Sequence, residues 1–345
     1  MRVAMAMAAL VVAGSVPWHA STTMQPGAGT VGRLARQVGL NDTQLSAVRN
    51  GEPVIADVRS SSDREIAVAG AVRVAAPAAR MMDLMRHVER LERGNGFLAT
   101  HRFSTPPTVE DMAALRLPDQ DVADLRRCRP GRCGVKLGTD ALAAVARIDW
   151  LRPDAAEQAN ALARRMAVDY VERYRAGGNQ ALAIYHDAER PTFVAREFED
   201  MVRRSPLLTS TLPEVSAYLL SYPLGRPAGV DDFFYWSLAQ FGLKPVVRIN
   251  HAVVHPTATS GDLRGVVTVK QLYASHYFHT ALEVRAIVDD TERPGRGHYL
   301  VVLNLARSDG LTGLLGGMVK RKAREGARAG LSAALRTMKA RAESP

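Results

Sequence analysis

The side chains best suited to ligand chemistry gather in residues 266–290, a stretch without proline or glycine. Its polar and aromatic members are Lys270, Gln271, Tyr273, Ser275, His276, Tyr277 and His279. The many β-branched and aromatic residues favour one or two strands. Because strand side chains alternate between faces, those at positions 271, 273, 275, 277 and 279 would share one face. That mixture is typical of a ligand-cavity wall; an exposed sheet face with aromatic cross-strand pairs is the alternative.

Several histidines could act in acid–base chemistry or in metal binding. His276 or His251 beside a tyrosine could transfer protons inside a cavity. His276 and His279 would point to opposite faces of a strand, whereas His251 and His255 share a face that Glu283 could join as a metal ligand. The sequence has no nucleophile elbow, phosphate loop or paired-carboxylate motif. We therefore predict no catalytic residue, no metal site and no cofactor.

The two cysteines, Cys128 and Cys133, stand in RRCRPGRCG. A Pro-Gly turn between them brings the thiols together, and an even number of cysteines in an exported chain favours a disulfide. Closing so small a loop stabilises the fold by about 2 kcal/mol. Two cysteines without a second pair cannot complete a zinc site.

Composition and the first residues indicate the compartment. The chain has 345 residues, of which 47% are hydrophobic and 23% charged, as in globular proteins with a sizeable core. Residues 1–24 have the pattern of an export signal: Arg2, an apolar run over residues 3–14, and a possible cleavage position at Ala20. The run is too short to span a bilayer. We expect a bacterial protein that is periplasmic or secreted.

Elements with strand and helix patterns flank a helical middle. Strands are expected at residues 65–74, 97–103, 246–255 and 298–307, and helices at residues 77–93 and 311–342. Residues 25–60 are expected to form a linker with short helices. The segment from about 107 to 243 has successive helical patterns, including one at residues 231–241 whose acids would favour a helix start. We interpret it as an insertion between two parts of one sheet; a separate helical domain is the alternative.

This order of elements resembles the START-like, or helix-grip, superfamily. The residues that carry the resemblance are EIAVAGAVRVAAPAARMMDLMRHVERLERG at 65–94 and HYLVVLNLARSDGLTGLLGGMVKRKA at 298–323. It extends over residues 60–104 and 245–342, and the whole chain also resembles a group of secreted bacterial proteins. The resemblance implies an α+β domain, residues 61–342, in which a curved antiparallel sheet packs on a long C-terminal helix and holds an apolar ligand. The superfamily has no catalytic signature to transfer.

The expected function is therefore binding of a lipid or another apolar small molecule between sheet and helix. Gln271, Tyr273, Tyr277, His251 and His276 are the predicted ligand-binding residues. An enzyme acting on such a ligand, and an insertion that binds another protein, are the alternatives.

The charge distribution suggests a further partner. The net charge is +10, and the residues from 318 onward include eight basic and two acidic side chains. Lys320, Arg321 and Arg324 could meet anionic lipid head groups, or the face could simply be solvated. We do not expect nucleic acid as a partner, because no aromatic residues are interleaved with these charges.

Overall fold

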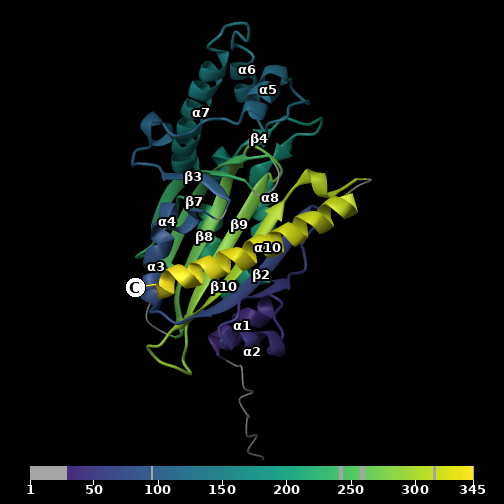
Figure 1. Ribbon diagram of the computed structural model, residues 1–345. Helices are drawn as coiled ribbons and strands as arrows, with labels where there is room; N and C mark the ends of the chain where they lie inside the picture. The colour runs from purple at the N-terminus through teal and green to yellow at the C-terminus, as the bar shows by residue number, and fades with distance from the viewer. Residues whose placement is uncertain (1–28, 95, 241–243, 257–260, 314–315, 345) are drawn as a thin grey trace, which may run out of the picture.

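A computed structural model describes residues 29–94, 96–240, 244–256, 261–313 and 316–344 (Figure 1). The predicted export signal lies outside these residues. Eight antiparallel strands form one curved sheet in the order β1-β2-β10-β9-β8-β7-β6-β3. Their bounds are β1 Val54–Asp57, β2 Glu65–Val74, β3 Phe97–Arg102, β6 Asp231–Ala239, β7 Val246–Pro256, β8 Leu263–Ala274, β9 Thr280–Asp289 and β10 His298–Arg307. The protein is thus α+β, as predicted.

Helices cover both faces of this sheet. One face packs against α3 (Ala78–Arg86), α4 (Val88–Glu92) and the long C-terminal helix α10 (Gly316–Glu343), and we call it the α10 face. The other, the α7 face, packs against α1 (Thr30–Gln37), α2 (Asp42–Arg49), α7 (Ala155–Gly177), α8 (Val194–Arg203) and α9 (Pro213–Ser221). The inner strands are therefore covered on both sides, which explains why β2 and β10 are buried almost throughout.

The helical segment extends past one end of the sheet. There α5 (Asp119–Arg127) and α6 (Thr139–Val145) lie beside α7 (Figure 1). They share a small apolar cluster that includes the predicted disulfide between Cys128 and Cys133. The remaining short elements are η1 Val109–Met112, η2 Gly178–Ala181, β4 Ile184–Tyr185, β5 Thr192–Phe193, η3 Leu207–Thr211 and η4 Asp309–Leu311. Among the described residues, no helix has the length and apolarity to cross a membrane.

Two predicted elements differ from the structure. Residues 231–239 form strand β6 rather than a helix, so the helical segment ends at Ser221. The reason is the aromatic run from Phe233 to Trp236: Phe233 and Tyr235 fill the α10 face, while Phe234 and Trp236 fill the α7 face. The predicted helix over residues 77–93 is two helices that meet at His87.

Helix α10 packs most closely on the sheet along its second half. Leu331, Leu335 and Met338 are buried against the sheet. Met318 and Val319, in the first turn of α10, are 50% and 43% exposed. The first turns of α10 therefore leave large apolar side chains in solvent.

Candidate functional site

A row of three side chains crosses the α7 face of the sheet. Phe234 on β6 is opposite His251 on β7, and His251 is opposite Lys270 on β8. Side chains at paired positions of neighbouring strands lie side by side, which brings these residues together although the sequence separates them. The Phe234 and His251 rings stack, with centroids 4.6 Å apart.

Lys270 is a buried lysine without a carboxylate partner in the described chain. Its side chain is 1% exposed, and Nζ donates to the hydroxyl of Tyr174, 3.1 Å away, and to the side-chain oxygen of Asn179. Nζ also lies 3.8 Å from the centre of the Phe198 ring. Burial lowers the pKa of Lys270 well below its usual value, because the ammonium form loses its hydration.

His251 continues the polar chain from Lys270 towards the surface. Its Nδ1 is 3.5 Å from the Tyr174 hydroxyl, and its Nε2 is 3.4 Å from a carboxylate oxygen of Asp232. Burial lowers the pKa of His251, although Asp232 opposes this effect. A neutral ring that donates from Nε2 to Asp232 must accept at Nδ1, and the Tyr174 hydroxyl is placed to donate there. Lys270, Tyr174, His251 and Asp232 thus form a continuous hydrogen-bonding chain.

Asp232 carries this chain to a surface cleft. Burial alone would raise the pKa of Asp232, but contacts with His251, Arg226 and the Tyr218 hydroxyl hold it below its usual value. Arg226 lies 3.4 Å from its second oxygen. Burial and, to a smaller extent, the Asp232 carboxylate raise the pKa of Tyr218 to about 12. Asp232 is therefore a charged group with one side towards the cleft and the other towards His251.

The cleft has a volume of about 660 Å³ and lies where β6 extends past the end of β3. Aromatic rings form much of its wall, from β6 and from the segment that follows α9. The lining residues are Thr105, Glu172, Arg175, Ala176, Tyr218, Tyr222, Pro223, Arg226, Asp232, Phe233 and Phe234. Such a wall of apolar rings with a few charged groups is typical of small-molecule sites.

Arg175 is the cation in this cleft that lacks a partner. It lies in the last turn of α7 and is half-buried. No hydrogen bond or ion pair joins it to another described residue. Arg226, by contrast, pairs with Asp232 and donates to the Val230 carbonyl. Glu172, one turn before Arg175, is exposed to solvent. A half-buried guanidinium without a partner in the described chain is suited to an anionic group.

One of the five predicted ligand-binding residues, His251, lies behind this cleft. Gln271 follows Val267 and Val269 on the α10 face, where its amide donates to the Phe278 carbonyl. Tyr273 packs on the α7 face near Tyr185. The predicted common face is therefore wrong, because the register of β8 shifts after Gln271 and turns the following residues over.

The other two predicted residues lie beyond the end of β8. Tyr277 is in the turn before β9, with a φ of 60°, and its hydroxyl accepts from the Lys244 amide. His276 forms a buried pair with Asp121 of α5, at 2.8 Å. Both side chains attach the β8–β9 turn to neighbouring segments. Their role in ligand binding stays a prediction.

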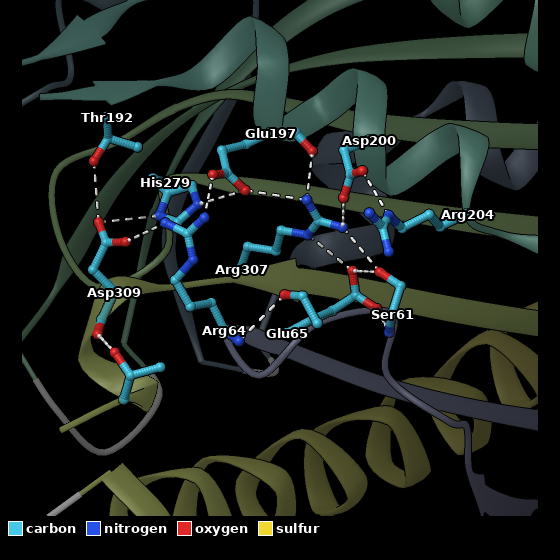
Figure 2. Close-up of polar contacts among 12 residues, drawn as sticks. Ser61, Arg64, Glu65, Thr192, Glu197, Asp200, Arg204, His279, Arg307 and Asp309 are labelled. Atoms are coloured by element: carbon cyan, nitrogen blue, oxygen red, sulfur yellow. Dashed lines mark hydrogen bonds and ion pairs between the residues drawn. The ribbon is translucent and has the colours of Figure 1, made fainter. Parts of the chain in front are cut away.

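A second polar cluster joins α8 to the sheet (Figure 2). Arg307, 2% exposed, lies 2.9 Å from Glu65, 3.1 Å from Glu197 and 2.9 Å from Asp200. The buried His279 lies between Glu197 and Asp309, at 3.8 and 3.6 Å. Contact with His279 lowers the pKa of Glu197 to about 2, with help from Arg64 and Arg307. Each charged side chain of the cluster has an oppositely charged neighbour. This pairing indicates that the cluster holds α8 on the sheet.

Sequence reasoning missed Asp232, Arg175 and Lys270 as members of a site. Asp232 was hidden by the helix predicted at residues 231–241, although four consecutive aromatic residues after it are a strand signal. Lys270 was in the predicted polar stretch but was given no role. Nothing local distinguishes Arg175 from the other arginines of its helix.

The comparisons give no relative for this site. No protein-family model matches the chain, and no curated protein has a sequence close enough to count as a match. Within the described residues, no three histidine, cysteine, aspartate or glutamate side chains are grouped so that they could hold a metal ion.

Proposed function

We propose that the protein binds, in this cleft, a small molecule with an apolar body and an anionic group. The observation that carries the proposal is a partly buried, unpartnered Arg175 in the same cleft as the rings of Tyr218, Tyr222 and Phe234. Burial of apolar ligand surface against these rings contributes roughly 25 cal/mol per Å² before the costs of association. A carboxylate, phosphate or sulfate at Arg175 fixes the orientation.

A fatty acid or a similar amphipathic lipid has this chemistry. The START-like resemblance favours an apolar ligand, and the order of β2, α3, β3, the antiparallel strands β6 to β10 and α10 supports that resemblance. In this proposal the ligand occupies the α7 side of the sheet, not the space between the sheet and α10. An exported protein of the cell envelope would meet such ligands, and the Cys128–Cys133 disulfide supports export.

Three twelve-carbon probes test the choice of head group. Dodecanoate should bind most tightly, dodecanol more weakly, and dodecyltrimethylammonium most weakly, because only the first places a negative charge at Arg175. Calorimetry at fixed ionic strength measures the three affinities. Equal affinity for all three would mean that Arg175 does not select the ligand.

Arg175→Ala should weaken dodecanoate binding by about tenfold, the effect of one lost charge-assisted hydrogen bond. Its control is Arg165→Ala, which removes the same charge from an exposed position of the same helix. Dodecanol binding should be unchanged in both variants. A loss of dodecanoate affinity that is the same for Arg165→Ala and Arg175→Ala would contradict the proposal.

Acid–base chemistry on the bound molecule is the second candidate, and the chain from Lys270 to Asp232 is the observation that favours it. A proton taken up by Asp232 could pass to His251 behind it. Mass spectrometry of a native ligand incubated with the protein tests this candidate. Turnover should disappear in Asp232→Asn while binding remains. A ligand whose mass stays constant even in D2O, where proton transfer to carbon would add deuterium, leaves binding as the whole function.

A further inference from the structure

A second cleft, separate from the first, lies at the start of α10. It has a volume of about 660 Å³ between the β1–β2 loop and the first turns of that helix. Its lining residues are Asp57, Val58, Arg59, Ser60, Ser61, Ser62, Asp63, Lys320 and Arg324. It shares no residue with the cleft beside Asp232. Three basic side chains and three hydroxyls meet two acids there.

Two of these residues have polar atoms without a partner. The Nε of Arg324 and the hydroxyl of Ser60 are both buried and form no hydrogen bond within the described residues. Arg324 also forms no ion pair with a described residue, although neighbouring Arg328 pairs with Asp57 at 3.1 Å. A buried donor without an acceptor costs about 1–3 kcal/mol, so an acceptor supplied by a ligand would remove a real penalty.

The remaining groups of this cleft leave its charge positive. Asp57 is neutralised by Arg328, which stands outside the lining. Lys320 donates to the backbone carbonyl of Asp63, so its charge has no carboxylate partner at that contact. Arg59 is exposed. Asp63 sets one negative charge against the positive charges of Arg59, Lys320 and Arg324, so an anion entering the cleft would meet a net positive charge.

We propose that this cleft binds a phosphate group. Arg324 offers a planar set of donors that matches two phosphate oxygens, Lys320 adds a point charge, and the Ser60 hydroxyl donates to a third oxygen. The adjacent Met318 and Val319 are exposed. If the phosphate belongs to a membrane lipid, its binding places these two side chains at the membrane surface. A phosphate on a free molecule has the same recognition chemistry.

Inorganic phosphate titrated into the full chain, at constant ionic strength and followed by calorimetry, tests the site. Arg324→Ala should weaken binding by about tenfold and Ser60→Ala by about threefold, because each removes a donor to the anion. Arg321→Ala is the matched control: it deletes the same charge one turn earlier, from an exposed position that does not line the cleft. It should change the affinity by less than about twofold.

Absence of phosphate binding to the unmodified chain overturns the proposal. So does an equal loss in Arg321→Ala and Arg324→Ala, which would mean that only the general charge of α10 attracts the anion.

Vesicles identify the source of the phosphate. With a lipid source, phosphatidylcholine vesicles containing phosphatidic acid bind the protein, inorganic phosphate competes, and Arg324→Ala abolishes binding while Arg321→Ala keeps it. With a free phosphorylated molecule as the source, vesicle binding does not depend on Arg324, and phosphate binding in solution still does. Both results require the Arg324 site.

Discussion

Lys270 is the residue whose placement most needs a reason. A lysine so deeply buried destabilises a fold unless its contacts offset the lost hydration. Here the offsetting contacts are the Tyr174 hydroxyl, the Asn179 amide oxygen and the rings of Tyr174 and Phe198. An apolar residue of similar length would avoid the cost. The lysine makes sense as the inner end of the hydrogen-bonding chain that reaches Asp232, where it holds the orientation of Tyr174 and, through it, of His251.

Glu197 permits a prediction about acid stability. Its folded-state pKa of about 2 is below the ordinary value of 4.5, so its contribution is fully present above pH 4.5 and is lost as the pH falls towards 2. Glu197→Gln removes this titration. The free energy of unfolding, from urea denaturation, should therefore fall less between about pH 5 and pH 3 in the variant than in the unmodified chain.

Glu199→Gln is the control for this comparison, because Glu199 is exposed on the same helix and pairs with exposed Arg203. In Glu199→Gln, the free energy of unfolding should change with pH as it does in the unmodified chain. If the Glu197 variant follows it too, the carboxylate between His279 and Arg307 does not have the depressed pKa described above.

Among the elements, β2 and α10 show how closely a sheet and a helix approach each other. A methyl group added at Gly70 would lie 2.8 Å from a Leu335 methyl, 2.7 Å from an Ile55 methyl and 2.9 Å from the Val54 carbonyl oxygen. The strand does not bulge there; the register of β2 with β1 and β10 is continuous through Gly70. The glycine therefore serves the packing of Leu335, not the bending of the strand.

Gly70→Ala should destabilise the protein by about 1–3 kcal/mol, because the methyl group overpacks this contact. Gly326→Ala is the matched change on α10, where nothing lies within 4 Å of the added methyl. It should be neutral or stabilise by up to about 1 kcal/mol, since alanine is the better helix former. Denaturant unfolding measures both, and equal effects would contradict the packing described for Gly70.

Local patterns predicted some of these elements and failed for others for physical reasons. The bounds of β2 and β10 follow from alternation and flanking turn residues, and those of α9 from Pro213 at its start. Helix α2 is capped by Asn41, whose side chain accepts from the Gln44 amide. The short edge strand β1 was not predicted, since its four residues carry little pattern.

The candidate site was less predictable than the elements because tertiary contacts assemble it. Lys270 and Tyr174 are 96 positions apart, and Tyr174 and His251 are 77 apart. A register shift of one residue in β8 reversed the faces expected for Tyr273 and the residues after it. Periodicity reports which residues alternate, but it does not report where a strand bulges or which helix covers it.

At the scale of the molecule, the sheet separates two apolar layers with different contents. On the α10 face, α3 and α10 lie against the sheet (Figure 1). Their side chains and those of the sheet, among them Met81, Met85, Leu331 and Leu335, pack into one cluster. On the α7 face, the apolar core is interrupted by the polar chain from Lys270 to Asp232. The helical segment thus supplies both the cover of that face and three sides of the cleft, from α7, from α9 and from the segment after α9.

Native mass spectrometry of the full chain, purified without detergent, tests the central claim that the cleft beside Asp232 holds an amphipathic anion. The account predicts an adduct with the mass of a lipid-like acid, retained in Arg165→Ala and lost or strongly reduced in Arg175→Ala. A protein that carries no adduct and binds no dodecanoate when supplied, or an adduct present equally in both variants, would contradict it.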